Sequence, residues 1–145
     1  MIHLNEIKNK INKKENFYFL VIISILFTLD RYSKIEIIKN FNDKSFYVND
    51  FLNLDLTWNT GVGFGLLSSS SEFYYNAVTV IIAIIILFII LYILNSKRFN
   101  KIAFSIILGG ALGNFYDRLS FKAVPDFIDF HYNNFHWFTF NVADI

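Results

Sequence analysis

The chain has 145 residues, of which 54% are hydrophobic and 17% are charged, with a mean hydropathy of +0.42 and a formal net charge of +1. This length is that of a single domain, and the apolar composition indicates a membrane protein. The charges form no basic face, which argues against nucleic-acid binding, and the absence of cysteine excludes disulfides, a thiol nucleophile and cysteine-ligated metal.

The first predicted element is a transmembrane helix over residues 16–34. Its apolar run from Phe17 to Leu29 is preceded by a lysine-rich segment, residues 8–14. A cleavable signal peptide begins in a similar way, but no small-residue cleavage site follows the run, so we expect an uncleaved span. A helix that continues to Lys34 is long enough to cross the bilayer, and its charges then lie at one end.

A β-rich region is expected over residues 41–68. Apolar and polar residues alternate from Leu52 to Asn59, which predicts a strand with one apolar face. An earlier strand is predicted at residues 46–48, and Gly61 and Gly63 indicate a turn or a close backbone approach. These patterns predict a small sheet on the membrane surface.

Two further transmembrane helices are predicted over residues 73–95 and 102–118. The N-terminus and the loop between these helices are both basic, which places them on the cytoplasmic side. The following outer segment, residues 119–140, contains Pro125. This proline ends the preceding helix, so Asp126 is expected in an irregular stretch near the membrane surface.

Polar residues gather at the predicted outer ends of the spans. They are Asp30, Lys34, Asn114, Asp117, Arg118, Asp126 and Asp144. This distribution favours a reaction centre at the outer interface over an ion path through the membrane.

Several of these residues share a helix face. Asp30 and Lys34 are four residues apart and form either a structural ion pair or part of a site. The third span has a GxxxG pattern at 109–113, which allows another helix to approach closely. Asn114 and Arg118 follow on that packed face, where polar groups need partners.

Asp126 and Asp144 are the carboxylates best placed for catalysis, because the aromatic-rich segment between them can fold back and bring them together. Two carboxylates in contact at a partly dry site share a proton. The ionised group then takes a proton from water, and the protonated group polarises the scissile amide. In the simpler alternative, Asn141 only caps a helix that has Asp144 in its first turn.

Four motifs follow one another along nearly the whole chain. They are D-x-x-S-K at 30–34, N-x-G-x-x-F at 59–64, G-G-A-x-G-N-x-x-D-R at 109–118, and V-x-D-F at 124–127 followed by F-N-x-A-D at 140–144. In this order and on this topology, the motifs resemble those of signal peptidase II, the bacterial lipoprotein signal peptidase family.

The resemblance implies a mainly α membrane protein, an intramembrane aspartyl protease that uses no metal or cofactor. Its helical transmembrane bundle would have three spans present and a fourth missing or only begun, with a small periplasmic β-rich cradle. The implied reaction removes signal peptides from prolipoproteins, just before a cysteine that carries diacylglycerol. The enzyme would lie in the bacterial inner membrane, surrounded by lipid, with a cytoplasmic N-terminus and an active site near the periplasmic face.

Individual residues follow from the motifs. Asp126 and Asp144 fall at the positions of the family's two catalytic aspartates. Other matching positions support the site or contact the substrate: Asp30, Lys34, Asn59, Gly61, Asn114, Arg118 and Asn141.

The chain departs from the family pattern at three places. The family usually has a proline at the position of Phe138 and a glycine at the position of Lys122. Its fourth span follows the last motif, whereas this sequence ends at Ile145. We therefore expect a C-terminally incomplete peptidase domain over residues 1–145, inactive by itself.

Two other functional classes compete with the protease. A non-enzymatic membrane protein, such as a small transporter or assembly factor, would tolerate replacement of Asp126 or Asp144 by asparagine. A metalloprotease would use His131 and His136, but these are five residues apart and no HExxH motif is present.

A Ser–Lys peptidase would use Ser33 and Lys34. Adjacent residues of a helix do not face each other, so this dyad is not expected. Asp129 is expected to be a solvated or interfacial acid rather than a third catalytic group.

Overall fold

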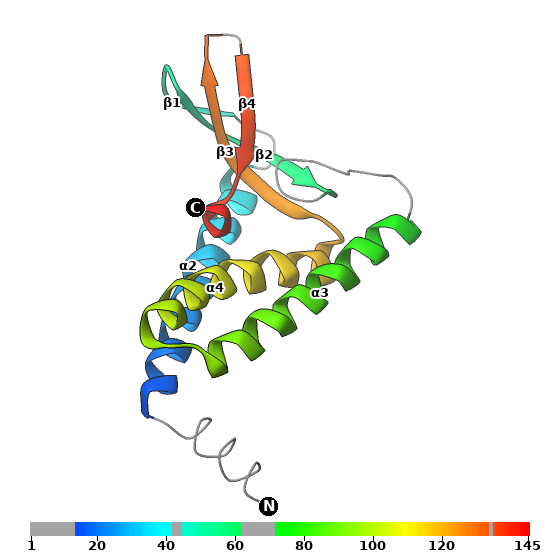
Figure 1. Cartoon of the computed structure of the whole chain (residues 1–145). Helices are drawn as coiled ribbons and strands as arrows, with labels where there is room; N and C mark the ends of the chain where they lie inside the picture. The colour runs from blue at the N-terminus through cyan, green and yellow to red at the C-terminus, as the bar shows by residue number, and fades with distance from the viewer. Residues whose placement is uncertain (1–13, 42–44, 62–71, 134) are drawn as a thin grey trace, which may run out of the picture.

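The computed structural model describes residues 14–41, 45–61, 72–133 and 135–145. Its long helices are α2 (Lys14–Phe41), α3 (Glu72–Asn95) and α4 (Arg98–Phe121). The strands are β1 (Phe46–Asn49), β2 (Leu52–Asn59), β3 (Val124–Tyr132) and β4 (Phe135–Phe140), followed by the 3-10 turn η2 (Val142–Asp144). The helices form one layer, and the sheet lies beyond one end of them with the β3–β4 hairpin pointing away (Figure 1).

The three long helices cover the three predicted spans, and each extends beyond the predicted bounds. Helix α4 packs against both α2 and α3. The contact between α3 and α4 is centred on Ile86, Ile93 and Leu108. Other apolar side chains of α3 are exposed, and within the described ranges α3 is the helix that is long and apolar enough to cross a membrane.

The glycines of the third span lie at close helix contacts, as the GxxxG pattern predicted. A Cβ on Gly109 would lie 2.7 Å from Cβ of Leu26 on α2, and a Cβ on Gly113 would overlap the carboxylate of Asp30. Gly110 faces the other way, and a Cβ there would overlap the backbone carbonyl of Ala143. Small residues therefore bring α2 and η2 up to the surface of α4.

The sheet is antiparallel with strand order β1-β2-β3-β4. The predicted strands near 46–48 and 52–59 are confirmed. The sheet also contains β3 and β4, two strands that lie outside the predicted β-rich region. Asp126 accordingly lies in a strand rather than an irregular stretch. Pro125 does end helical geometry, but proline is also tolerated at the start of a strand, where fewer ladder hydrogen bonds are lost.

The predicted apolar face of β2 holds for only part of the strand. The register between β2 and β3 shifts between Leu54 and Thr57. Beyond this irregularity the alternation changes, so Trp58 is exposed and Asn59 is buried. The predictions for Gly63 and for residues 62–68 lie outside the described residues.

Helix α4 ends at Phe121 and is followed by Lys122 in the left-handed region, with φ of 55°. The N–H of Lys122 donates to the carbonyl of Arg118, a common way to close a helix. Glycine adopts this conformation without the steric cost that a side chain brings. The exposed side chain of Lys122 instead pairs with Glu72, with 2.7 Å between Nζ and Oε1.

Candidate active site

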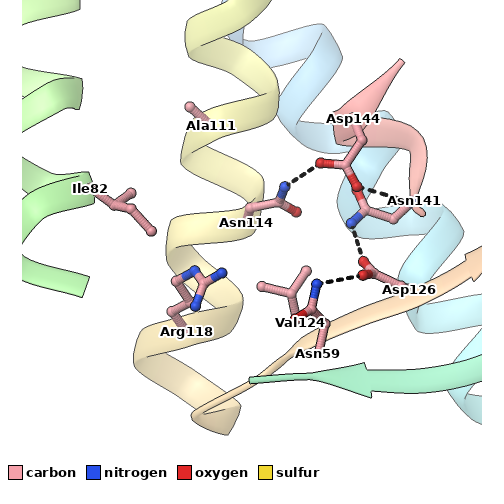
Figure 2. A pocket seen from close by; sticks show the side chains of 9 residues that line it. All are labelled: Asn59, Ile82, Ala111, Asn114, Arg118, Val124, Asp126, Asn141 and Asp144. Carbon is pink, nitrogen blue, oxygen red and sulfur yellow. Dashed lines mark hydrogen bonds between the residues drawn. The ribbon is translucent and has the colours of Figure 1, made fainter. Parts of the chain in front are cut away.

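A cavity of about 170 Å³ lies where α3, α4, the sheet and η2 meet. Figure 2 shows its lining: Asn59, Ile82, Ala111, Asn114, Arg118, Val124, Asp126, Asn141 and Asp144. Both predicted catalytic aspartates and four of the predicted supporting residues are among them. Segments that are far apart in the sequence therefore direct carboxylate, amide and guanidinium groups to one cavity.

Asp126 is buried at the start of β3, with 3% of its surface exposed. Its Oδ1 accepts a hydrogen bond of 2.6 Å from Nδ2 of Asn141, and its Oδ2 accepts one of 2.9 Å from Nδ2 of Asn59. Burial raises the pKa of Asp126 to about 6, although these two hydrogen bonds oppose the rise. The nearby charge of Asp144 adds to it. Asp126 is therefore a carboxyl group that takes up a proton readily.

Asn141 connects the two aspartates. It is fully buried and is the N-cap of η2, where its side-chain oxygen accepts from the N–H of Ala143 at 2.8 Å. In return, Oδ2 of Asp144 accepts from the backbone N–H of Asn141 at 3.2 Å. This reciprocal capping box confirms the prediction that Asn141 caps a helical turn containing Asp144. The amide of Asn141 also binds Asp126, so one residue contacts both carboxylates.

Asp144 is more exposed than Asp126 and rests on the helices. Its Oδ1 accepts from Nδ2 of Asn114 at 3.0 Å. The other end of the Asn114 amide, Oδ1, accepts from Nζ of Lys34 at 2.7 Å. Because an ammonium group only donates, Lys34 fixes the orientation of this amide and directs its N–H groups to Asp144.

Lys34 is fully buried between α2 and α4 and has two carboxylate partners. Its Nζ lies 2.8 Å from Oδ2 of Asp30 and 2.8 Å from Oδ2 of Asp117. The second carboxylate also pairs with Arg31, which packs over the ring of Tyr116. The predicted Asp30–Lys34 pair is confirmed as part of this larger buried network.

The same network holds η2 in place. Oδ1 of Asp30 accepts from the backbone N–H of Ala143 at 3.2 Å. Ala143 in turn packs against Gly110 of α4. The turn that carries Asp144 is thus fixed by contacts to both α2 and α4.

Arg118 and Gly61 meet on the other side of the cavity. The guanidinium of Arg118 donates to the carbonyl of Gly61, and the N–H of Gly61 donates to Oδ1 of Asn59 at 2.8 Å. Tyr75 donates to the carbonyl of Arg118 at 2.9 Å. Nη1 of Arg118 is buried, and no hydrogen-bond partner for it is found among the described residues.

The structure brings eight of the nine predicted site residues into the cavity or into direct contact with its lining, and the ninth, Asp30, contacts Lys34 and the backbone of η2. The sequence interpretation did not assign Asp117 or Arg31 to the site. The signal for Asp117 was its position in the third motif, on the helix face next to the glycines. Ser33 donates to the carbonyl of Asp30 at 2.8 Å rather than facing Lys34, in agreement with the rejection of a Ser–Lys dyad.

One alternative of the prediction for a neighbouring acid was wrong. Asp129 is not solvated, because it is only 5% exposed in the interior strand β3. Its carboxylate binds Nδ1 of His136 at 2.8 Å and 3.0 Å. Neither His131 nor His136 lines the cavity that holds Asp126 and Asp144.

Comparison with known proteins identifies the family. The family model described as signal peptidase (SPase) II matches residues 22–145. The chain belongs to the signal peptidase II family. It is therefore a membrane protease of lipoprotein processing, and the resemblance drawn from the motifs is confirmed.

Individual relatives agree with this family assignment. The lipoprotein signal peptidase of Pelagibacter ubique is 47% identical over 140 residues, which are 94% of this chain and 84% of the relative. That of Alteromonas mediterranea is 36% identical over 139 residues, covering 93% of this chain and 76% of the relative.

Solved structures also resemble the fold. Two structures, each described as a bacterial membrane enzyme, align with TM-scores of 0.68 and 0.70 at 31% and 29% identity. Each alignment covers 88% of this chain, with 78% of the first structure and 83% of the second. The helices and the attached sheet are therefore arranged as in membrane enzymes.

Proposed function

We propose that the protein is an aspartic endopeptidase that removes signal peptides from prolipoproteins, cleaving just before a cysteine modified with diacylglycerol. The observation that carries this proposal is the position of Asp126 and Asp144 on one cavity, joined through Asn141. Family membership supports the substrate class. The two carboxylates can perform the hydrolysis with no metal or cofactor.

The environments of the aspartates suggest how they divide the reaction. Asp126 is buried with a raised pKa and is the carboxyl group to which we assign the shared proton, whereas the more exposed Asp144 serves as the base. The apolar substrate displaces water as it enters the cavity, which raises the affinity of Asp126 for its proton further. The pair is then ready for general acid–base catalysis.

In the proposed reaction a water molecule lies between the two carboxyl groups. Asp144 takes a proton from this water as its oxygen attacks the scissile carbonyl carbon, and Asp126 donates its proton to the carbonyl oxygen. The tetrahedral intermediate then breaks its C–N bond. The leaving amine takes the proton from Asp144, and Asp126 regains a proton from the intermediate, which restores the starting state.

The remaining residues would orient the substrate and the two acids. Asn59 and Asn141 hold the Asp126 carboxyl group, and Asn114, positioned by Lys34 and Asp30, holds Asp144. The buried Nη1 of Arg118 supplies a donor for a carbonyl of the substrate backbone, and Gly61 supports Arg118. These roles match the donor and acceptor directions of each side chain.

The proposed location is the bacterial inner membrane, with α2, α3 and α4 as spans. The lysine-rich N-terminus and the loop at 95–101 would lie in the cytoplasm, following the distribution of basic residues. The sheet and the cavity would then lie at the periplasmic face. Prolipoproteins and the surrounding lipid are the expected partners.

The test is cleavage of a diacylglyceryl-modified prolipoprotein by the protein expressed from its own gene in cells depleted of this activity. Asp126→Asn and Asp144→Asn should each lower the cleavage rate by at least about 10²–10⁴-fold, because one proton-transfer group is lost. The amount of protein in the membrane should not change. The control is Asp55→Asn, an exposed carboxylate on β2 outside the cavity.

Two results would contradict the proposal. Cleavage at the wild-type rate by either aspartate variant would favour the non-enzymatic alternative. Loss of the chemical step in a strong chelator, with the protein still folded, would favour a metalloprotease.

A further inference from the structure

A second cluster of potentially reactive side chains lies near the turn of the β3–β4 hairpin, where the hairpin projects away from the helices (Figure 1). Asp129 and His131 lie on β3 and His136 lies on β4, with candidate ligand atoms all within 4.8 Å of one another. His131 and His136 are paired across the two strands, and their rings stack with 5.1 Å between centroids. The hairpin register thus brings two imidazoles and a carboxylate together.

Two of the three residues in this cluster are buried although they lie near a turn. Asp129 is 5% exposed and His131 is 8% exposed. Nδ1 of His131 is buried without a hydrogen-bond partner among the described residues, and it lies 3.5 Å from Oδ2 of Asp129. A buried polar atom without a partner costs about 1–3 kcal/mol, so its retention calls for a group that it can bind.

A neighbouring side chain shows the same feature. Asn53 on β2 is the register partner of Asp129, so both side chains are directed to the same face of the sheet. Oδ1 of Asn53 is also buried and has no hydrogen-bond partner in the part of the chain that the structure describes. Carboxylate oxygens, an amide oxygen and an imidazole nitrogen lone pair are all acceptors, and a cation satisfies them together.

We propose that Asp129, His131 and His136 bind a divalent transition-metal ion, with Zn²⁺ as the best match. Two imidazoles and one carboxylate are a usual three-ligand set for zinc, with a fourth position for water. Ligand atoms about 2.0–2.1 Å from a tetrahedral ion are about 3.4 Å apart, close to the separation of His131 and Asp129. His136 is largely exposed, so its ring is free to move outward from its present hydrogen bond.

The ion would join β3 to β4 beside their turn. The start of β3 carries Asp126, so the metal would stabilise the strand from which one proposed catalytic carboxyl group extends. The ion would take no part in peptide hydrolysis, because none of its three ligands lines the cavity. This proposal is independent of the aspartic mechanism, since its test measures metal binding rather than activity.

The test is titration of the purified protein in detergent, made without a polyhistidine tag and freed of metal with a chelator. Zn²⁺ should bind with a stoichiometry of one ion per chain in isothermal titration calorimetry. Co²⁺ should produce the intense visible absorption of a tetrahedral site. Mg²⁺ should not compete with Zn²⁺, because it prefers octahedral oxygen ligands.

Variants separate this site from adventitious binding. His136→Gln and His131→Gln should each raise the Kd for Zn²⁺ by at least about tenfold, because a direct ligand contributes at least as much as the outer groups that orient ligands. His3→Gln, which removes the remaining histidine of the sequence, is the matched control and should leave the Kd unchanged. His136 is exposed, so its variant is expected to fold normally and decides the result even if the His131 variant does not fold.

Three results would overturn the proposal. These are the absence of saturable 1:1 binding, an unchanged Kd in His136→Gln, and equal loss of binding in His3→Gln. In each case the cluster would be held by the hydrogen bond between Asp129 and His136 and by the stacking of the two imidazoles alone.

Discussion

The two aspartates of the cavity are held by different parts of the molecule. Asp126 belongs to the sheet, where it is buried and bound by the side-chain amides of Asn59 and Asn141. Asp144 belongs to a short turn that rests on the helices, where Asn114 and the buried charges behind it provide support. The sheet supplies a desolvated environment, and the helices supply a polar one.

This difference shows how two identical side chains acquire different properties. Removal of water raises the pKa of Asp126, whereas Asp144 is more exposed and is held by a polar side chain. The difference between the two aspartates therefore follows from where the backbone places them. The surroundings of Asp126 in the sheet and of Asp144 on the helices can be disturbed separately.

The largest effect is expected from a substitution in the buried charged network of α2 and α4 that supports Asp144. Lys34→Met removes the buried ammonium group that contacts both Asp30 and Asp117. The two carboxylates then stay buried with too little positive charge beside them. Loss of one partner of a buried ion pair typically costs about 3–5 kcal/mol. Unfolding in detergent micelles should measure a decrease of this size in the free energy of unfolding.

The matched control for this variant is Lys39→Met, in the exposed last turn of the same helix. It should change stability by less than about 0.5 kcal/mol, as surface substitutions usually do. Equal stability of Lys34→Met and Lys39→Met would show that the buried network is not what supports η2.

The next largest effect is on the stability contributed by Asp126 in the sheet, and it depends on pH. The pKa of Asp126 is about 6 in the folded chain and 3.8 as its ordinary value. The folded state therefore binds more protons than the unfolded state between these values, and this contribution to stability is lost as pH rises through about 6. The stability of the wild type relative to Asp126→Asn should fall by about 3 kcal/mol between pH 3 and pH 8.

The measurement is the free energy of unfolding of both proteins across this pH range. Asp55→Asn, which removes an exposed charge from the same sheet, should not reproduce the pH dependence. A difference between wild type and Asp126→Asn that stays constant with pH would mean that Asp126 is not desolvated.

A smaller effect is expected where η2 meets α4. In Gly110→Ala the new methyl group would overlap the backbone carbonyl of Ala143 and displace the turn that carries Asp144. Overpacking of this kind costs about 1–3 kcal/mol. The cleavage rate should fall while the pH dependence of stability due to Asp126 persists.

Gly109→Ala is the comparison, because its methyl group meets Leu26 of α2 rather than η2. Both variants should lose stability, but Gly110→Ala should lose more activity at equal folded amount. Equal losses of activity would mean that the position of η2 does not control the reaction.

The smallest effect is a displacement of the pH–rate profile. Asn59→Leu removes one hydrogen bond to the Asp126 carboxylate, so its pKa should rise further. We expect the alkaline limb of kcat/KM to move up by about one pH unit, the equivalent of a hydrogen bond worth about 1.4 kcal/mol.

Asn114→Leu is the matched variant in the helical half, since it removes the donor to Asp144 instead. It should act on the acidic limb. If both variants displace the same limb, the assignment of the proton to Asp126 is wrong.

The sequence predicted the helices and most of the site because their signals are local or motif-based. Long apolar runs located α3 and parts of α2 and α4, and the spacing of Asp30 and Lys34 predicted their pairing. Ordered motifs predicted which distant residues would meet, which no local pattern can do. The prediction that the 145-residue chain is inactive by itself stays a prediction.

The errors arose where tertiary contacts decide the outcome. β3 was missed because Pro125 was taken as the start of an irregular segment, whereas pairing with β2 makes it the start of a strand. Asp129 was taken as solvated because burial on an interior strand depends on the neighbouring strands, β2 and β4. Asp117 was not assigned, because its role depends on cations from another helix.

The hairpin between the two aspartates has one further consequence. Asn141 contacts both acids and lies directly after β4 has returned to the cavity, whereas Asp126 lies where β3 leaves it. The number of residues in the β3–β4 hairpin does not affect the separation of the two carboxyl groups. Residues added or removed in pairs at the turn would preserve the strand register and leave the spacing of the carboxyl groups unchanged. The tip of the hairpin is therefore expected to accept such changes, or a grafted peptide, without a change in the positions of Asp126 and Asp144.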